Sequence, residues 1–222
     1  MNNKILIKGT LKPFNKVINI EGDKSLSIRW ALLASQSIGK STATNLLKSE
    51  DVLNTINCLK KLGVKISLFK NKCEIHGLGI NGYKYKKNII LNAGNSGTLA
   101  RLIMGLLVHS KNKIKIIGDK SLSKRDFKRI AEPLSLFGAE FKLKKNKSLP
   151  LTILGSSNLK PIKYRESRGS AQCKSSVIFG GMRTNGTTKI KAKKSRNHTE
   201  LLCDYLNLPI KIKSKKKYDE IK

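Results

Sequence analysis

A repeat of about 72 residues constrains the fold of this chain more than any other feature. Three apolar segments typical of buried helices begin near residues 25, 97 and 170, at spacings of 72 and 73 residues. A second helix is predicted after each, and it starts every time at a serine, a preferred N-cap residue: Ser49, Ser123 and Ser195. A fixed period of this length predicts copies of one supersecondary unit that share a core.

Segments typical of strands fill the gaps between these helices. STATNL, VKISLF and KCEIHG belong to the first unit, KIKIIG, AEFKLK and LPLTIL to the second, and TTKIKA and PIKIK to the third. Strands that alternate with helices predict one α/β domain, with the helices inside and the sheets outside or the reverse. No Pro/Gly/Ser-rich linker interrupts residues 22–222. We therefore expect residues 22–222 to be ordered, and residues 1–21 and the Lys-rich tail to fray.

The charge of the chain suggests an anionic partner without naming one. The formal net charge is +32, and clustered Lys and Arg are typical of proteins that bind nucleic acid. Here, however, 38 of the 46 basic residues are Lys spread along the whole chain, which an AT-rich genome also produces. Aromatic residues make up only 5% and do not alternate with basic ones as base stacking requires. An acidic small-molecule substrate suits the charge equally well, and we do not expect nucleic acid as a partner.

Membrane segments and metal motifs are missing from the sequence. No apolar run approaches the ~18–20 residues of a membrane span, and the first residues, MNNKILIKGTLKP, resemble neither a signal nor a transit peptide. We expect a cytoplasmic protein without a membrane partner. The four cysteines lie far apart without a CxxC pair, so we assign no zinc and no disulfide. Cys58 and Cys203 fall on apolar helix faces, which predicts buried thiols.

An octet occurs twice, as GDKSLSIR at residues 22–29 and as GDKSLSKR at residues 118–125. Each copy begins a predicted helix, and a helix N-terminus favours an anion because its N–H groups are free and its dipole end is positive. In the first copy Lys24 and Ser25 lie at the helix start, and Arg29 lies one turn further on the same face. The alternative is an N-cap with exposed charges, for which the octet alone provides no test.

Three further helix starts are polar in the same way. GNSGTLARL (94–102) carries Gly97, Thr98 and Arg101; RGSAQCKSS (168–176) carries Ser170, Gln172 and Lys174; SRNHTELL (195–202) carries Ser195, Arg196 and Thr199. Each of them alone is equally consistent with an ordinary polar first turn, and we interpret His198 as a surface residue. Because all of them occur in one repeat architecture, they are expected to point toward one end of the domain.

Taken together in order, these motifs resemble the 5-enolpyruvylshikimate-3-phosphate synthase family. The series GDKSxSxR, SEDV, GNSGTxxR, GDxSLSKR, EPLxxxGA, SAQxKSS and SRxHTE covers nearly all of residues 20–208. The resemblance implies two similar domains, each of three βαβαββ units around buried helices. It also implies transfer of the enolpyruvyl group of phosphoenolpyruvate to the 5-hydroxyl of shikimate 3-phosphate. The hydroxyl attacks C2 as C3 is protonated, and the tetrahedral intermediate then loses phosphate. No cofactor and no metal is implied.

The resemblance also assigns site residues. It implies shikimate 3-phosphate contacts from Lys24, Ser25, Arg29, Ser170, Ala171, Gln172 and Arg196. It implies phosphoenolpyruvate contacts from Lys24, Gly97, Thr98, Arg101, Arg125 and Gln172, with Lys24 as the catalytic residue of this half. The two octets would thus serve one substrate each, although no role transfers to Lys120 and Ser121.

Several positions depart from the family pattern. Glu21 and Asp126 stand where proline is usual, Trp30 where alanine is usual, and Arg168 and Gly169 where a small apolar pair is usual. Glu21 and Asp126 would place negative charge near the anion sites.

Length is the larger departure, because family members are about twice as long. By the resemblance, residues 1–21 belong to the second domain, and residues 22–222 form a truncated substrate-binding domain whose second domain is missing. A separate C-terminal half is then a candidate partner, and we expect the chain alone to be inactive.

Three alternatives compete with this interpretation. The related transferase that acts on UDP-N-acetylglucosamine uses a catalytic cysteine and an Asn-rich motif, whereas residues 110–125 contain no cysteine and GDKSLSIR replaces that motif. A basic domain that binds RNA or DNA would lose affinity steeply with salt. A decayed gene product would keep the fold without the function.

Overall fold

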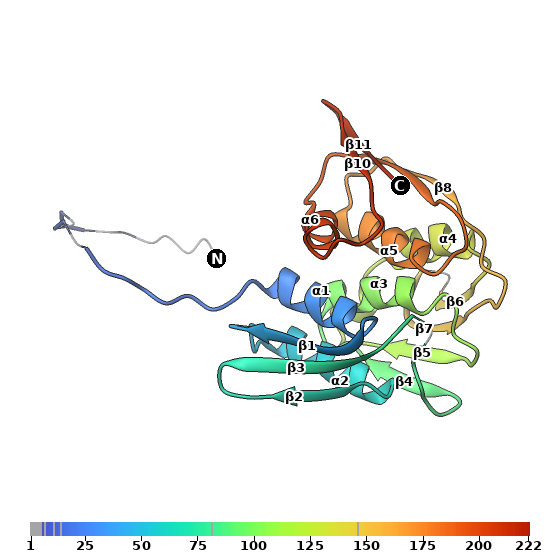
Figure 1. The fold of residues 1–222 in the computed structure, drawn as a ribbon, viewed down its shortest axis with the longest axis horizontal. Helices are drawn as coiled ribbons and strands as arrows, with labels where there is room; N and C mark the ends of the chain where they lie inside the picture. The colour runs from blue at the N-terminus through green and yellow to red at the C-terminus, as the bar shows by residue number, and fades with distance from the viewer. Residues whose placement is uncertain (1–5, 7, 11, 14, 81, 146) are drawn as a thin grey trace.

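The computed structural model describes residues 6, 8–10, 12–13, 15–80, 82–145 and 147–222, which form three successive units (Figure 1). The first unit contains α1 (Lys24–Ala34), β1 (Ile38–Thr44), α2 (Glu50–Lys61), β2 (Lys65–Leu68) and β3 (Lys72–Leu78). The second contains β4 (Ile89–Asn92), α3 (Gly97–Leu106), β5 (Ile114–Ile117), the 3₁₀ turn η1 (Leu122–Lys124), α4 (Lys128–Ser135), β6 (Glu140–Lys144) and β7 (Ser148–Leu154). The third contains β8 (Lys163–Glu166), α5 (Ala171–Gly181), β9 (Lys189–Lys193), α6 (His198–Tyr205), β10 (Ile212–Ser214) and β11 (Tyr218–Ile221).

Each unit builds its own sheet. The strand orders are β1-β3-β2, β4-β5-β7-β6 and β10-β11-β9-β8. In the second and third sheets one pair is parallel, β4 with β5 and β8 with β9, and the other pairs are antiparallel. These two units therefore have the order βαβαββ, which confirms the predicted α/β repeat. Among the described residues of the first unit, no strand takes the place that β4 and β8 occupy.

The first helix of each unit lies at the centre of the domain. Figure 1 shows α1, α3 and α5 side by side, with the sheets on the outside. Their composition explains this position, because the residues from Leu99 to Leu106 in α3 and from Cys173 to Gly180 in α5 are all buried. A largely apolar helix can be covered on every side when its few polar side chains, such as Arg101 and Lys174, have partners inside the domain. Of the two arrangements that the sequence left open, the helices are thus inside.

Two of the second helices begin later than predicted. The serines at 123 and 195 are not their N-caps, because α4 starts at Lys128 and α6 at His198. After Ser121 the chain makes only the short η1 turn, and Arg125 is extended with ψ of 154°. Before α6, Asn197 lies outside the helical region with φ of −112° and ψ of 25°. The third prediction of this kind is confirmed, since Ser49 precedes α2 directly.

The prediction of a fraying Lys-rich tail was wrong. Residues Tyr218–Ile221 form β11, which pairs with β9, and Ile221 is buried. The Asp219 carboxylate accepts a hydrogen bond from Lys194 at 2.8 Å and one from Ser214 at 2.8 Å, which holds this strand between its two neighbours. At the other end, the prediction for residues 1–21 falls partly on residues outside the described part; those that are described there lie in no helix or strand.

The helices and the cysteines can be compared with two expectations from the sequence, the absence of a membrane span and the burial of thiols. Each helix of the described part is too short or too polar to cross a bilayer. Cys58 and Cys203 are buried as predicted, and so are Cys73 and Cys173. Burial raises the pKa of the Cys58 and Cys203 thiols to about 12.

Candidate functional site

One cavity collects the N-termini of all three central helices. It has a volume of about 680 Å³, and the first two residues of each helix line it: Lys24 and Ser25 of α1, Gly97 and Thr98 of α3, Ala171 and Gln172 of α5. The three helices are capped alike, since the side chains of Asp23, Ser96 and Ser170 each accept a hydrogen bond from the N–H three residues on. Three positive dipole ends therefore converge on one space, as an anion site requires.

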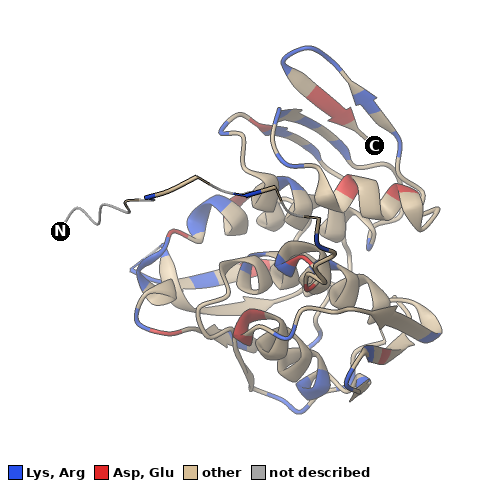
Figure 2. Ribbon diagram, turned by 90° about the vertical axis from the view of Figure 1, so that its left-hand side faces the viewer, with Lys and Arg blue, Asp and Glu red and all other residues tan. Residues whose placement is uncertain are grey.

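The charges around the cavity agree with the dipoles. Four cationic side chains line it: Lys24, Arg29, Arg125 and Arg196. Asp51 is the only acidic side chain among the described lining residues, and its carboxylate lies 3.1 Å from Lys24 Nζ. The cavity thus carries an excess of positive charge and suits a ligand with more than one negative charge. Lys and Arg also far outnumber Asp and Glu along the ribbon as a whole (Figure 2).

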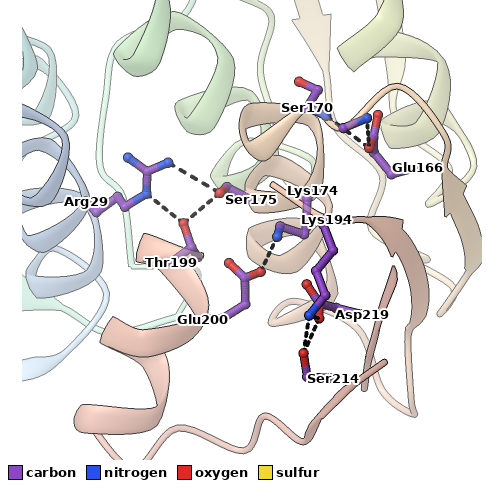
Figure 3. A network of polar contacts seen from close by, with 11 residues as sticks. Arg29, Glu166, Ser170, Lys174, Ser175, Lys194, Thr199, Glu200, Ser214 and Asp219 are labelled. Atoms are coloured by element: carbon purple, nitrogen blue, oxygen red, sulfur yellow. Dashed lines mark hydrogen bonds and ion pairs between the residues drawn. The ribbon is translucent and has the colours of Figure 1, made fainter. Parts of the chain in front are cut away.

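Arg29 reaches the cavity from inside the domain. Only 4% of its surface is exposed, and its donors contact Thr199 Oγ1 at 2.7 Å, the Ser25 carbonyl at 3.0 Å and Ser175 Oγ at 3.5 Å (Figure 3). Burial lowers the pKa of the guanidinium, while the charge of Glu200 raises it. All three hydrogen-bond partners are uncharged, so the positive charge of Arg29 is held in place without being neutralised by them.

The repeated octet has one local structure with two continuations. The Asp23 carboxylate accepts from Leu26 N at 2.7 Å, and the Asp119 carboxylate accepts from Leu122 N at 2.6 Å. After this shared cap, the first octet continues as α1 and the second as η1. Both final arginines, Arg29 and Arg125, nevertheless line the cavity.

Asn95 connects the second octet to the cavity. Its amide donates to the Asp119 carboxylate at 2.8 Å and accepts from Arg125 at 3.1 Å. Lys120 and Ser121 do not line the cavity. Within the second octet, the aspartate and the arginine are therefore the residues that serve this site.

Arg101 lies behind the cavity rather than on its wall. It is 6% exposed, stacks over the Phe127 ring and donates to Gln172 Oε1 at 2.6 Å. The pKa of Arg101 falls to about 10, first because of burial and then because Arg129 and Arg125 are near. Arg101 is therefore shielded from solvent within this domain itself. Gln172 also donates to Thr98 Oγ1 at 3.1 Å, so its amide links α3 to α5 at the cavity.

The loop before α5 depends on Glu166, which belongs to none of the sequence motifs. Glu166 is 2% exposed, and its carboxylate accepts the backbone N–H groups of Arg168 (3.0 Å), Gly169 (2.7 Å) and Ser170 (3.0 Å). Gly169 has φ of +73°, a conformation that favours glycine. Glu166 thereby sets the position of Ser170 and of the α5 N-terminus.

Ten of the eleven predicted site residues line this cavity, and Arg101 is the exception. Among the remaining lining residues, Ser195 was named from the sequence only as part of a polar helix start, and four were not predicted for the site at all: Asp51, Asn95, Gly169 and His198. Asn95 lies within the quoted glycine-rich motif, and Asp51 is an acidic residue in the first turn of a helix, so position alone offered a signal. His198 was interpreted from the sequence as a surface residue, and the structure places it on the wall of the cavity.

The departures Glu21 and Asp126 do not line the cavity. The Asp126 carboxylate instead accepts from Lys128 N at 2.8 Å, at the start of α4. No group of three His, Cys, Asp or Glu side chains that could hold a metal ion occurs in the described part of the chain.

Comparisons with known proteins agree on one family. The family model described as EPSP synthase (3-phosphoshikimate 1-carboxyvinyltransferase) matches residues 9–222. A 3-phosphoshikimate 1-carboxyvinyltransferase of Streptococcus suis is 40% identical over 196 residues, which are 87% of this chain and 46% of that protein. The enzyme of the same name from Paracoccus denitrificans is 37% identical over 190 residues, 85% of this chain and 43% of its own length.

The fold comparison points the same way. The structure of EPSP synthase from Acinetobacter baumannii superposes with a TM-score of 0.84 at 33% identity, covering 92% of this chain and 46% of that one. The chain thus spans a little under half the length of the relatives that it matches. Because the family model matches nearly the whole chain and the fold and motif order agree, this chain belongs to the EPSP synthase family.

Proposed function

We propose that this chain forms the shikimate 3-phosphate-binding half of a 3-phosphoshikimate 1-carboxyvinyltransferase of aromatic amino-acid biosynthesis. The complete enzyme would transfer the enolpyruvyl group of phosphoenolpyruvate to the 5-hydroxyl of shikimate 3-phosphate and release phosphate. The observation that carries the proposal is the convergence of three helix N-termini and four cationic side chains on one cavity. A cytoplasmic location stays a prediction from the sequence.

The two substrates are assigned to different parts of the cavity. Ser25, Arg29, Ser170, Ala171, Gln172 and Arg196 are proposed to hold shikimate 3-phosphate, and Gly97, Thr98 and Arg125 to hold phosphoenolpyruvate. Lys24 is proposed to contact both. Gln172 retains one lone pair and one N–H beyond its bonds to Arg101 and Thr98, which suits a hydroxyl group. Arg101 is proposed to act on phosphoenolpyruvate from behind Gly97.

The chemical contribution of this half is electrostatic. The 5-hydroxyl loses its proton and attacks C2 of phosphoenolpyruvate while C3 takes a proton. The tetrahedral intermediate then loses phosphate from C2 and a proton from C3, which restores the double bond. Fixed cations such as Lys24 and Arg125 would stabilise the negative charge of the substrates and of the departing phosphate. In the free chain Lys24 contacts Asp51, so ligand phosphate would compete with that carboxylate.

Turnover is proposed to need a second half, on the same polypeptide or on a separate one. The relatives are about twice as long as the part that this chain matches. Closing a cleft around anionic substrates excludes water and strengthens every charge interaction in it. The 222-residue chain alone is therefore expected to bind shikimate 3-phosphate weakly and to release no phosphate.

Calorimetric titration of the chain tests this proposal. Shikimate 3-phosphate should bind, whereas unphosphorylated shikimate should not. Arg29→Ala should weaken binding by roughly 1.5–3 kcal/mol for each charge-assisted bond lost. Lys120→Ala is the matched control, because it removes a cation of the second octet outside the cavity.

Arg196→Ala is a second test variant. Arg196 lines the cavity but is exposed, so this substitution is not expected to disturb folding as loss of the buried Arg29 could. The proposal fails if shikimate and its phosphate ester bind alike, or if neither arginine variant changes affinity.

A further inference from the structure

A buried ion pair lies next to the cavity without lining it. Lys174 Nζ of α5 lies 2.5 Å from Glu200 Oε1 of α6, and the two side chains are 0% and 2% exposed. Beyond this contact, neither Lys174 Nζ nor Glu200 Oε2 has a hydrogen-bond partner among the described residues. The pair is thus shielded from water, and Asp219 lies within electrostatic reach of Lys174, whose charge contributes to lowering the pKa of that carboxyl.

The ion pair lies beside the residues that hold Arg29. Ser175 follows Lys174, and Thr199 precedes Glu200, and the hydroxyl groups of these two neighbours lie 2.6 Å apart. Arg29 donates to both hydroxyls. Helices α5 and α6 are therefore joined by two adjacent links, a hydroxyl link that touches Arg29 and an ionic link behind it (Figure 3).

Glu200 lies within electrostatic reach of Arg29. Its charge raises the pKa of the Arg29 guanidinium, against the larger effect of burial. A carboxylate in this position stabilises the cation, but it also competes with any anionic ligand for the same charge. In a site with little water this competition is strong, because charges interact more strongly at low dielectric constant.

Lys174 is the residue that pairs with this carboxylate. We propose that Lys174 is a positioning residue of the anion site, which binds and neutralises the Glu200 carboxylate and so keeps the Arg29 charge available to a phosphate ester. The inference rests on the proposed binding of a phosphate monoester in this cavity. Lys174 itself touches no ligand in this account, since it does not line the cavity.

A structural role alone makes a different prediction. A buried ion pair is weak evidence for stability, because desolvation offsets its attraction. If the pair only ties α5 to α6, every substitution that breaks it should impair folding and binding together. If Lys174 acts by neutralising Glu200, removal of the carboxylate should make Lys174 dispensable for binding.

Three variants separate these roles: Lys174→Met, Glu200→Gln and the double variant. Affinities for shikimate 3-phosphate and for inorganic phosphate are measured by calorimetry on protein shown to be folded by circular dichroism. We expect Lys174→Met to weaken binding about tenfold, because Glu200 then turns to Arg29. We expect the double variant to bind within about threefold of the wild type, and Glu200→Gln to bind at least as tightly.

Rescue by the second substitution is the decisive result. A double variant that binds as poorly as Lys174→Met would overturn the inference, and so would Glu200→Gln binding about tenfold more weakly than the wild type. If Lys174→Met does not fold, the double variant is compared with the wild type instead, and binding about tenfold weaker than the wild type by it or by Glu200→Gln overturns the inference. The proposed function is tested separately, by the preference of the wild type for shikimate 3-phosphate over shikimate. The present inference is tested by the ratios of the variants' affinities for inorganic phosphate.

Discussion

Replacing Gly105 by alanine tests the packing on which the site depends. Gly105 lies near the end of α3, where this helix crosses α5. A Cβ atom built on Gly105 would lie well inside van der Waals contact of the Ser176 carbonyl oxygen, 3.0 Å from its carbon and 3.1 Å from Phe179 Cβ. The obstacle is the backbone of a buried helix, which cannot rotate away. The helices must therefore move apart.

Two effects set the size of the loss. Overpacking of a close-packed interior costs about 1–3 kcal/mol, and a rigid backbone neighbour places this case near the upper end. Alanine in a helix interior recovers up to about 1 kcal/mol relative to glycine. We expect a net destabilisation of about 2 kcal/mol, which lowers the melting temperature by roughly 4–8 °C for a chain of this size.

The change should reach the site as well, because α3 carries Thr98 and Arg101, and both contact Gln172 of α5. Urea denaturation gives the free energy of unfolding, and calorimetry gives the affinity for shikimate 3-phosphate. Gly97→Ala in the same helix is the control for stability. Its added Cβ would meet only the ends of flexible side chains, the nearest being Arg125 at 3.1 Å and Arg101 at 3.3 Å. Equal stability of Gly105→Ala and the wild type would refute this description of the packing.

Three other predictions concern single groups. The pKa of His109 is lowered to about 4 by burial and by the charge of Arg183, and its neutral ring accepts from Arg183 at 3.2 Å. The unfolded chain then binds more protons between pH 6.5 and 4, so stability should fall by roughly 2 kcal/mol as the pH drops through this window. The urea midpoints of unfolding at pH 6.5 and pH 4 should differ less in His109→Gln than in the wild type. An equal difference in the two proteins would contradict the assignment. Glu166→Gln should cost about 2 kcal/mol of unfolding free energy in urea and weaken shikimate 3-phosphate binding, because one of its acceptor oxygens is lost; Glu140→Gln on the exposed face of β6 should do neither. The four buried cysteines should react with a thiol reagent at pH 8 only after urea is added; immediate reaction of all four in the native protein would show that the thiols are accessible.

The sequence alone determined the repeat, the helix starts at the cavity and the family. These features are local or periodic: Ser49 and Ser96 are cap residues by type, and the largely apolar composition of α3 by itself implies a central position. The polar helix starts predicted one shared end of the domain, and ten of the eleven site residues that the family resemblance assigned line one cavity there.

Tertiary structure decided what depends on contacts between units. Strands β4, β8 and β11 are too short or too charged to be recognised alone, and they become strands because a neighbouring strand takes up their hydrogen bonds. The two octets differ in one residue, yet only the first continues as a helix, since the chain after Arg125 must turn to place α4 on the core.

The same holds for the charged residues of the site. Arg29 and Arg101 are both buried arginines near helix starts, but Gln172 and Phe127 draw Arg101 behind the cavity, while uncharged partners leave Arg29 facing it. Lys174 resembles an ordinary polar residue of a first helical turn in the sequence. Its partner Glu200 belongs to the next helix, and only the packing of α5 against α6 brings the two charges together. The two are buried as a pair, because burial of either charge alone would be too costly.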